Sequence, residues 1–371
     1  MVISSLRTTA FRNLADTTVI TSSKNVFLVG KNGQGKTNFM EALYFCAYAS
    51  SFRRVHDSEI AQNKKKDFSA EVIIAHQSHT EDNYNKVLIK FETGKKTVFI
   101  DEKKIEDRKE LLSVIPCIVF CHDDMEFVAG SPEQQRRFFD QVLSLYDPVY
   151  LDDLRCYRRA LKSRNSVLRD YALYRLDGNP ETMLDALDQQ CVVYGVKLME
   201  KRETAAKLFS EIFELLYEEV SGIDGVNVQY APSWKSFNED ETAELLRKRR
   251  SAEMAAGISL SGPHRDRYLF VCNGEDFAGN ASTGQRRLLA LLLRVAQARR
   301  FSEMTGRNPI LLLDDVLLEM DGEKRRRFVA ALPDYDQAFY TFLPEEPFHH
   351  YRKEDTLVYY VKDGRIEAEK Q

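Results

Sequence analysis

The sequence predicts an α/β fold interrupted by an all-helical insertion, and three observations support this class. Strand-like segments joined by short turns fill residues 1 to about 121. The pattern becomes helical at Ser131, which precedes a proline and a glutamate, as at a helix N-terminus. Strand and turn signals return at Ser259 and continue to the Asp363-Gly364 turn. We therefore predict two parts of one head domain, residues 1–130 and 256–371, separated by a helical lobe, residues 131–255.

The helical lobe contains one long amphipathic segment. Between Pro180 and Gly222 apolar residues recur in steps of three and four, with a shift near Lys201. This spacing predicts a long helix, whole or broken near Lys201, which could reach roughly 50 Å at about 1.5 Å per residue. Such a helix either packs within a helical bundle or projects from the head, and the sequence leaves both arrangements open.

Composition excludes several classes of protein. Of the 371 residues 43% are hydrophobic, and 53 basic residues face 57 acidic ones, so the bulk charge does not indicate a nucleic-acid binder. No apolar run approaches the ~20 residues that cross a bilayer, and no signal peptide is evident, so we expect a cytoplasmic protein. Six scattered cysteines predict free thiols rather than a disulfide framework.

A phosphate-binding loop is the most specific motif. Residues 30–37 read GKNGQGKT, which fits G-x-x-x-x-G-K-[ST] between an apolar strand and a helix. Glycines let backbone N–H groups surround phosphates, and the helix N-terminus faces the same anions. Lys36 can reach the β- and γ-phosphates, and the Thr37 hydroxyl suits Mg²⁺. We predict ATP and Mg²⁺ as cofactors, with ATP held by Gly30, Lys31, Asn32, Gly33, Gln34, Gly35, Lys36, Thr37 and Asn38.

An acidic strand supplies the second half of the predicted site. Residues 309–313 are apolar and end in Asp314 and Asp315, as in a Walker B strand beside the P-loop. We expect Asp314 to hold Mg²⁺ through water and Asp315 to act as the general base toward the attacking water. Asp315 and Lys36 are thus the predicted catalytic residues.

The order of the motifs selects one branch of P-loop proteins. No Asn-Lys-x-Asp element is present, which argues against a GTPase, and Ser282-Thr283-Gly284-Gln285 precedes a helix. An acidic turn, residues 319–321, follows the acidic strand. This order predicts an ABC-type ATPase head, a mixed sheet with flanking antiparallel strands. In that layout Ser282, Gly284 and Gln285 of one copy cap the γ-phosphate bound by the other copy, and Asp321 forms the D-loop. Hydrolysis at such a dimer interface is expected to be slow.

Together these motifs resemble the bacterial RecF family of recombination and repair ATPases over nearly the whole chain. The resemblance is carried by FRN at 11–13, GKNGQGKTN at 30–38, GSP at 130–132 with Arg136, Arg137 and Asp140, SGPHRD at 261–266, STGQRR at 282–287 and LLLDDVLLEMD at 311–321. The resemblance implies an ATP-dependent clamp that recognises junctions of single- and double-stranded DNA at gaps. It also implies RecO and RecR as partners in loading RecA.

Several residues depart from the family pattern or leave alternatives open. His122 stands where the family commonly has proline, Arg267 where a second acid is usual, and Thr341 matches the threonine-rich strand only loosely. Arg53-Arg54 and Lys64–Lys66 are candidates for DNA contact or simply a solvated surface. The alternative function is a nucleotide-stabilised scaffold for repair proteins that neither grips DNA strongly nor depends on turnover. A small-molecule kinase is disfavoured by the S-x-G-Q helix.

Overall fold

The computed structural model describes residues 1–62, 65–76, 84–173, 180–317 and 320–369, which form two compact units. The first unit comprises Met1–Asp124 and Ala298–Gln371, and the second comprises Met125–Gln297. The second unit continues to Gln297, beyond the boundary at residue 255 that the sequence predicts. The difference arises because strands that follow residue 255 pair with a strand inside the insertion.

The first unit contains an antiparallel sheet with the strand order β2-β1-β4-β5-β6-β7. Its strands are β1 Val2–Thr9, β2 Thr17–Ile20, β4 Phe68–Ala75, β5 Tyr84–Glu92, β6 Lys95–Ile100 and β7 Lys103–Ile105. In β4 buried residues alternate with partly exposed ones, as expected for a sheet covered on one face. The predicted hairpins are confirmed: β4 pairs with β5, and β5 pairs with β6.

A second, mixed sheet of the first unit has the order β15-β14-β3-β13-β12-β8. Its strands are β3 Asn25–Val29, β8 Cys117–Phe120, β12 Ile310–Leu313, β13 Gln337–Phe342, β14 Thr356–Lys362 and β15 Arg365–Ala368. The central strands pair in parallel, and only β15 is antiparallel. Every residue of β3, β8, β12 and β13 is buried, which is typical of parallel strands covered on both faces.

Helices of the first unit are α1 Lys36–Tyr48, α2 Lys109–Val114 and α10 Gly322–Ala331, with short helices η1 Asp57–Glu59 and η4 Phe348–Tyr351. A short 3₁₀ turn, η2 His122–Met125, lies where the first segment of this unit ends. One buried cluster joins α1 to strands of both sheets, including Phe39 and Phe45 of α1. Burial of each such side chain stabilises the fold by about 1.5–3 kcal/mol. The α1 helix, which follows the P-loop, is therefore anchored in the core.

The second unit is mainly helical. Its elements are α3 Glu126–Ala129, α4 Pro132–Tyr146, α5 Pro148–Ala172, α6 Glu181–Ser221, β9 Val226–Ala231, α7 Glu239–Ala256, η3 Pro263–Arg265, β10 Arg267–Cys272, β11 Glu275–Asp276, α8 Phe277–Asn280 and the start of α9 Thr283–Thr305. The N-cap predicted at Ser131 is confirmed, because its hydroxyl accepts from the Gln134 amide at 3.4 Å. The predicted insertion was all helical, but β9 lies within it and pairs with β10.

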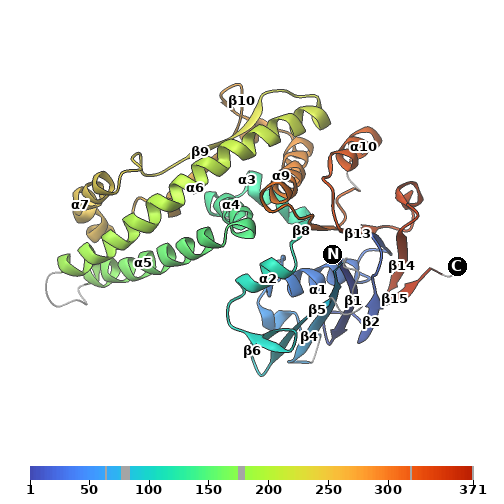
Figure 1. Cartoon of the computed structure of the whole chain (residues 1–371). Helices are drawn as coiled ribbons and strands as arrows, with labels where there is room; N and C mark the ends of the chain where they lie inside the picture. The colour runs from blue at the N-terminus through green and yellow to red at the C-terminus, as the bar shows by residue number, and fades with distance from the viewer. Residues whose placement is uncertain (63–64, 77–83, 174–179, 318–319, 370–371) are drawn as a thin grey trace. The chain divides into compact units, whose positions relative to one another are not determined.

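Helix α6 is unbroken over 41 residues and runs along α5 and β9 (Figure 1). The shift in apolar spacing near Lys201 has a local cause. Arg202 occupies a buried position, 2% exposed, where the pattern requires an apolar residue. Its guanidinium is satisfied by Asp140 at 2.7 Å and Asp266 at 2.8 Å. A buried ion-pair network thus replaces one apolar step without ending the helix.

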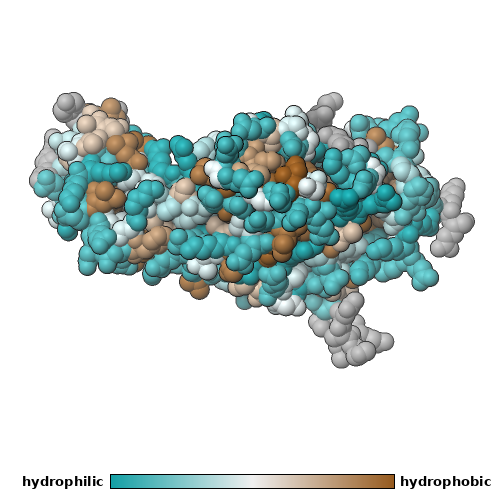
Figure 2. Space-filling view, turned by 90° about the horizontal axis from the view of Figure 1, so that it is seen from above, coloured by the Kyte–Doolittle hydropathy of each residue, from teal (hydrophilic) through white to brown (hydrophobic). Residues whose placement is uncertain are grey.

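Exposed hydrophobic residues are scattered over the surface rather than gathered in large patches. Large hydrophobic residues that are exposed, such as Ile20, Val149 and Leu215, are spread along the chain. On the face drawn in Figure 2 hydrophilic residues predominate, with hydrophobic ones in small groups among them. Among the described residues, no helix combines the length and apolar character needed to cross a bilayer. All six cysteines are free thiols, and four of them are buried.

Candidate nucleotide site

The P-loop joins the carboxyl end of β3 to the N-terminus of α1, and two of its glycines are required by geometry. Gly35 has φ +120°, a region that residues with side chains rarely adopt. A Cβ on Gly30 would lie 2.4 Å from the carbonyl oxygen of Val361, so no side chain fits there. The loop therefore packs closely against β14, and its backbone N–H groups can surround a chain of phosphates.

Lys36 lies inside this loop. It is 3% exposed, and its Nζ donates to the Gly30 carbonyl at 2.7 Å and to the Lys31 carbonyl at 3.3 Å. Within the described part of the chain it forms no ion pair with a carboxylate. A buried ammonium bonded only to neutral oxygens favours an anion beside it, because the anion compensates its charge.

The acidic pair lies at the same edge of the mixed sheet. Asp314 and Asp315 follow β12, and the Thr37 hydroxyl donates to Asp314 Oδ1 at 3.0 Å. The P-loop strand β3 and the acidic strand β12 are separated by β13. The side chains nevertheless meet, because the carboxyl ends of parallel strands share one edge.

This oxygen cluster fits Mg²⁺. Burial raises the pKa of Asp314 to about 6, and the neighbouring Asp315 adds to the shift, while the Thr37 hydrogen bond opposes it. A divalent cation would offset both the burial and the repulsion between the carboxylates. A hydroxyl and a carboxylate are also the ligand types that Mg²⁺ takes beside phosphate oxygens and water.

Thr341 connects the two carboxylates. Its buried hydroxyl accepts from the Asp315 amide at 2.7 Å, donates to Asp315 Oδ1 at 2.8 Å and lies 3.3 Å from Asp314 Oδ1. Asp315 itself has φ +53°, in the left-handed region. The local backbone and Thr341 together fix the direction of the Asp315 carboxylate. Sequence analysis left Thr341 without a clear role, since its match to the family pattern was loose.

The C-terminal hairpin supports the P-loop, a contact that sequence analysis missed. The turn between β14 and β15 donates two backbone N–H groups to Gln34, from Asp363 at 2.7 Å and from Gly364 at 2.9 Å. Gly364 also accepts from the Ala15 amide at 2.9 Å. Loop and hairpin are far apart in the sequence, so only the fold reveals that they meet.

This support makes Gly364 a testable position. A Cβ there would lie 1.8 Å from the Asn13 carbonyl oxygen. For Gly364→Ala we expect a loss of about 1–3 kcal/mol from the forced contact, together with weaker ATP binding. The control is Gly94→Ala, because Gly94 has the same φ of +77° but nothing within 4 Å of the added Cβ. Thermal unfolding and titration with a fluorescent ATP analogue measure both variants; equal effects would contradict the assigned contact.

A polar cavity of about 560 Å³ adjoins the P-loop and includes Arg12, Asn38 and Arg53 in its lining. Buried Glu41 orders these side chains. It pairs with Arg12 at 2.7 Å and with Arg53 at 3.4 Å, and Arg53 also donates to Asn38 at 2.9 Å. Arg53, a candidate from the sequence for DNA contact or for a solvated surface, thus lies next to the P-loop helix.

The S-x-G-Q segment belongs to the second unit, where it forms the start of α9. The Ser282 hydroxyl accepts from the Gln285 amide at 3.2 Å, and the Gln285 side chain accepts from the Ser282 amide at 2.8 Å. This capping box leaves Ser282, Thr283 and Gly284 exposed. Among the described residues, apart from its neighbours in the helix, no atom lies within 4 Å of a Cβ built on Gly284. Within the second unit the positive end of the helix is therefore uncovered.

The remaining predicted residues are placed as follows. Asp321 caps α10 by accepting from the Lys324 amide at 2.9 Å. Hydrogen bonds from the backbone and the side chain of Lys324 lower the pKa of Asp321. Glu319 and Lys64 lie outside the described residues. Lys65 pairs with Asp16 at 3.5 Å on the surface. An exposed pair of this kind contributes little, so the basic run carries no clear site.

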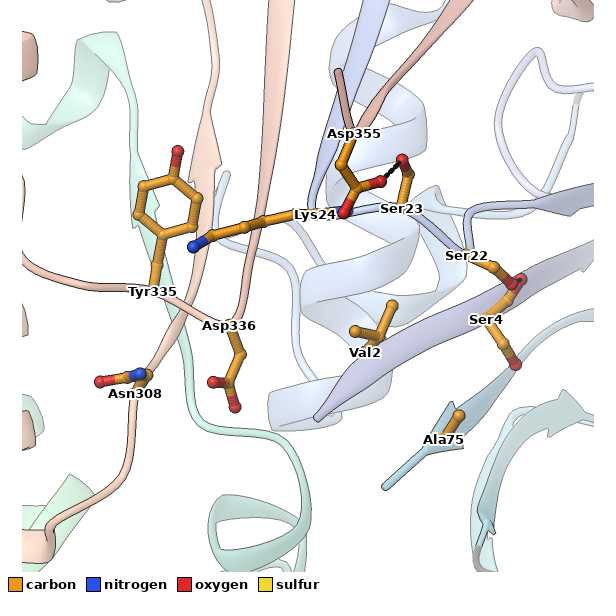
Figure 3. A pocket seen from close by; sticks show the side chains of 10 residues that line it. All are labelled: Val2, Ser4, Ser22, Ser23, Lys24, Ala75, Asn308, Tyr335, Asp336 and Asp355. Carbon is orange, nitrogen blue, oxygen red and sulfur yellow. Dashed lines mark hydrogen bonds between the residues drawn. The ribbon is translucent and has the colours of Figure 1, made fainter. Parts of the chain in front are cut away.

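A different cavity, about 470 Å³, lies at the opposite edge of the mixed sheet (Figure 3). Its lining residues Lys24, Asp336 and Asp355 precede the parallel strands β3, β13 and β14. Both carboxylates already have partners: Asp336 binds the N-terminal ammonium at 3.0 Å, and Asp355 accepts from Ser23 and from the Lys24 amide. The cavity is therefore separate from the P-loop edge, and its two carboxylates have partners within the protein.

Comparisons with known proteins cover nearly the whole chain. The family model described as the RecF/RecN/SMC N terminal domain matches residues 2–366. The DNA replication and repair protein RecF of Treponema pallidum is 42% identical over 95% of this chain and 97% of its own length. The protein of the same name from Bacillus subtilis is 30% identical over 99% of this chain and 100% of its own length.

Solved structures show the same fold. The recombination mediator protein RecF with ATP, in the RecFOR pathway, aligns with a TM-score of 0.89 at 23% identity over 100% of this chain and 98% of its own. The Smc head domain of Pyrococcus furiosus, bound to a domain of ScpA, aligns with a TM-score of 0.56 at 14% identity over 99% of this chain and 95% of its own. The predicted fold class, an ABC-type ATPase head with an inserted lobe, is confirmed.

Proposed function

The chain belongs to the RecF family, and we propose that it is an ATP-dependent DNA-binding protein of recombinational repair and replication. The observation that carries this proposal is the convergence of Lys36, Thr37, Asp314 and Asp315 at the carboxyl ends of the parallel strands of the mixed sheet. Relatives of high coverage are named DNA replication and repair proteins, which supports the biological setting. We expect the protein to act in the cytoplasm.

The P-loop, residues 30–38, is proposed to hold the phosphates of ATP. Lys36 exchanges its bonds to two carbonyls for phosphate oxygens, and the amides at the start of α1 donate to the same oxygens. Thr37 and Asp314 are positioned to hold Mg²⁺, which neutralises charge on the phosphates when bound. Asp315, oriented by Thr341, accepts a proton from the attacking water.

Ser282, Gly284 and Gln285 are proposed to complete the site of a second copy. Their helix end is exposed and positively polarised, and it meets no carboxylate within the described residues, so it can accept a γ-phosphate from outside. Asp321, exposed at the start of α10, is proposed to lie in the same interface. Because neither copy is complete alone, turnover is limited by dimerisation and is slow. Residues 256–297, which the sequence assigns to the head domain, would therefore take part in the ATPase site although they pack in the second unit.

The proposed substrate is gapped DNA with a junction of single and double strands. One solved relative is described as a recombination mediator in the RecFOR pathway, which supports RecO and RecR as partners in loading the recombinase. Contacts to DNA are expected to be mostly to phosphate and hence strongly dependent on salt.

The test combines gapped-DNA binding with ATP, ADP or no nucleotide and the molecular mass in solution. Wild-type protein should bind tightly only with ATP, and as a dimer. Ser282→Arg should remain a monomer and bind weakly, because a large cation fills the place of the γ-phosphate of the other copy. The control is Asn238→Arg, which removes the N-cap of α7 at a cost of about 1 kcal/mol and should leave dimerisation intact.

Two outcomes would contradict this proposal. If Ser282→Arg still dimerises and hydrolyses ATP like the wild type, the shared site is wrong. If the monomer binds DNA equally with or without nucleotide, the chain fits better a nucleotide-stabilised scaffold for repair proteins, which the net charge of −4 also favours.

A further inference from the structure

A cavity of about 600 Å³ in the second unit has a lining rich in arginine. It lies among α4, α5, α6 and η3, and nothing in the proposed nucleotide chemistry uses it. Five arginines and two carboxylates line it, so the lining is positive by three charges: Arg136, Arg137, Arg158, Arg202 and Arg265 against Glu133 and Asp140. Such an excess of like charge around one cavity is repulsive, and an anion that enters would relieve the repulsion.

The arginines divide into two groups. Arg202 and Arg158 both pair with Asp140, and Arg202 also pairs with Asp266, so their charges are compensated inside the protein. Arg136, Arg137 and Arg265 form no ion pair with any described residue. Arg136 donates only to a backbone carbonyl, that of Asp266, at 2.7 Å. Three guanidinium groups are thus available for an external anion.

The inner wall is rigid. Arg202 is 2% exposed and donates to the Pro263 carbonyl at 2.8 Å. Buried Tyr157 bonds to His264 Nδ1 at 2.8 Å, which fixes the ring against the cavity. A Cβ on Gly262 would lie 2.7 Å from the Tyr157 hydroxyl oxygen, so only glycine lets η3 approach this wall. Arg265, three residues after Gly262, donates to the Ser259 carbonyl at 3.3 Å and is held at the rim.

The electrostatics of the cavity agree with its geometry. Burial, together with the charges of Arg265 and Arg136 and against the hydrogen bond to the Ser259 carbonyl, lowers the pKa of His264 to about 4, so the ring is neutral near pH 7. Burial and the charge of Arg202 also lower the pKa of Arg136, and the carboxylates of Asp266, Asp140 and Glu133 only partly oppose this shift. A positive field with few compensating carboxylates is the environment that phosphate groups prefer, and guanidinium binds phosphate through paired N–H groups.

We propose that this arginine pocket binds a phosphate group. The phosphate belongs either to a nucleic-acid strand, in which case the inference rests on the proposed function and adds residues to it, or to free phosphate. Arg136 lies deepest of the three available arginines, and exposed Arg137 and Arg265 close around the anion.

The test removes the two exposed arginines together, as Arg137→Gln with Arg265→Gln. Neither side chain belongs to the nucleotide site, and neither pairs with a carboxylate, so the fold should be kept. The control is Arg247→Gln with Arg249→Gln, which removes the same charge from exposed positions of α7. Thermal unfolding checks all proteins. Binding is measured for a labelled single-stranded oligonucleotide over a range of salt, and for inorganic phosphate by calorimetry.

The expected result is a loss of oligonucleotide affinity on the order of tenfold in the pocket variant alone. The slope of log affinity against log salt should also become shallower, by about 1.4 for two lost contacts to a single strand. If only inorganic phosphate binding falls, the site stands and its ligand is free phosphate. The proposal is overturned if the pocket variant binds both probes like the wild type, or if both variants lose affinity equally.

ATP-dependent dimerisation, measured in parallel, separates this inference from the proposed function. Failure of the wild type to dimerise would contradict the shared nucleotide site, while the phosphate measurement would still decide the pocket.

Discussion

Lys36→Met protein should fold normally and lose ATP binding and ATP-dependent dimerisation. Met keeps the length and apolar stem of Lys36 but removes the ammonium that lies 2.7 Å from the Gly30 carbonyl oxygen. Loss of one partner from a buried charged contact costs about 2–5 kcal/mol, which corresponds to roughly 30- to 5,000-fold in affinity. Titration with a fluorescent ATP analogue measures the affinity, and light scattering with and without ATP measures the mass.

The matched control is Lys31→Met. Lys31 lies in the same loop, but its side chain is exposed and only its backbone faces the phosphates in the proposed arrangement. The control should therefore bind ATP within a few-fold of the wild type. Equal losses in the two variants would mean that charge near the loop matters in general, and that Lys36 has no special contact.

Much of the candidate site could be predicted from the sequence, because its motifs are local. The P-loop and the acidic pair are each continuous in the chain, and their flanking strands are short apolar runs, so residue order alone indicated that Lys36, Thr37 and Asp314 work together. The structure brings these residues to one edge of the mixed sheet. The fold class followed from the same order of motifs.

Long-range contacts could not be predicted in this way. The position of β13 between the P-loop strand and the acidic strand depends on parallel pairing of segments that are distant in the chain. Thr341 gains its contact with Asp315 from that pairing. The contact between Gly364 and the loop after β1 has the same origin.

Two further features could not be predicted because charged residues take part in them: the continuity of α6 and the arginine pocket. Arg202 is a polar residue at a core position, so the apolar spacing appeared to shift although α6 continues. The arginine pocket could not be predicted either, because its lining comes from four elements, α4, α5, α6 and η3, and bulk composition does not show where charges gather.

Asp315→Asn should bind ATP but hydrolyse it about 10²–10⁴ times more slowly, the usual contribution of a general base. Asn suits the position: it tolerates the left-handed φ of +53° better than other residues, and its oxygen can still accept from Thr341. Only the charge and the proton-accepting capacity are lost. The dimer formed with ATP should therefore persist, and so should its complex with gapped DNA.

Phosphate release and the lifetime of the ATP-bound dimer measure these effects, with Asp334→Asn, an exposed site, as the control for loss of one negative charge. Removal of the Asp315 charge should also lower the pKa of Asp314 from about 6, because that charge contributes to the shift. Mg²⁺ binding should then be kept, which separates a role in proton transfer from a role in holding the metal. An Asp315→Asn enzyme with normal turnover would show that another group accepts the proton from water.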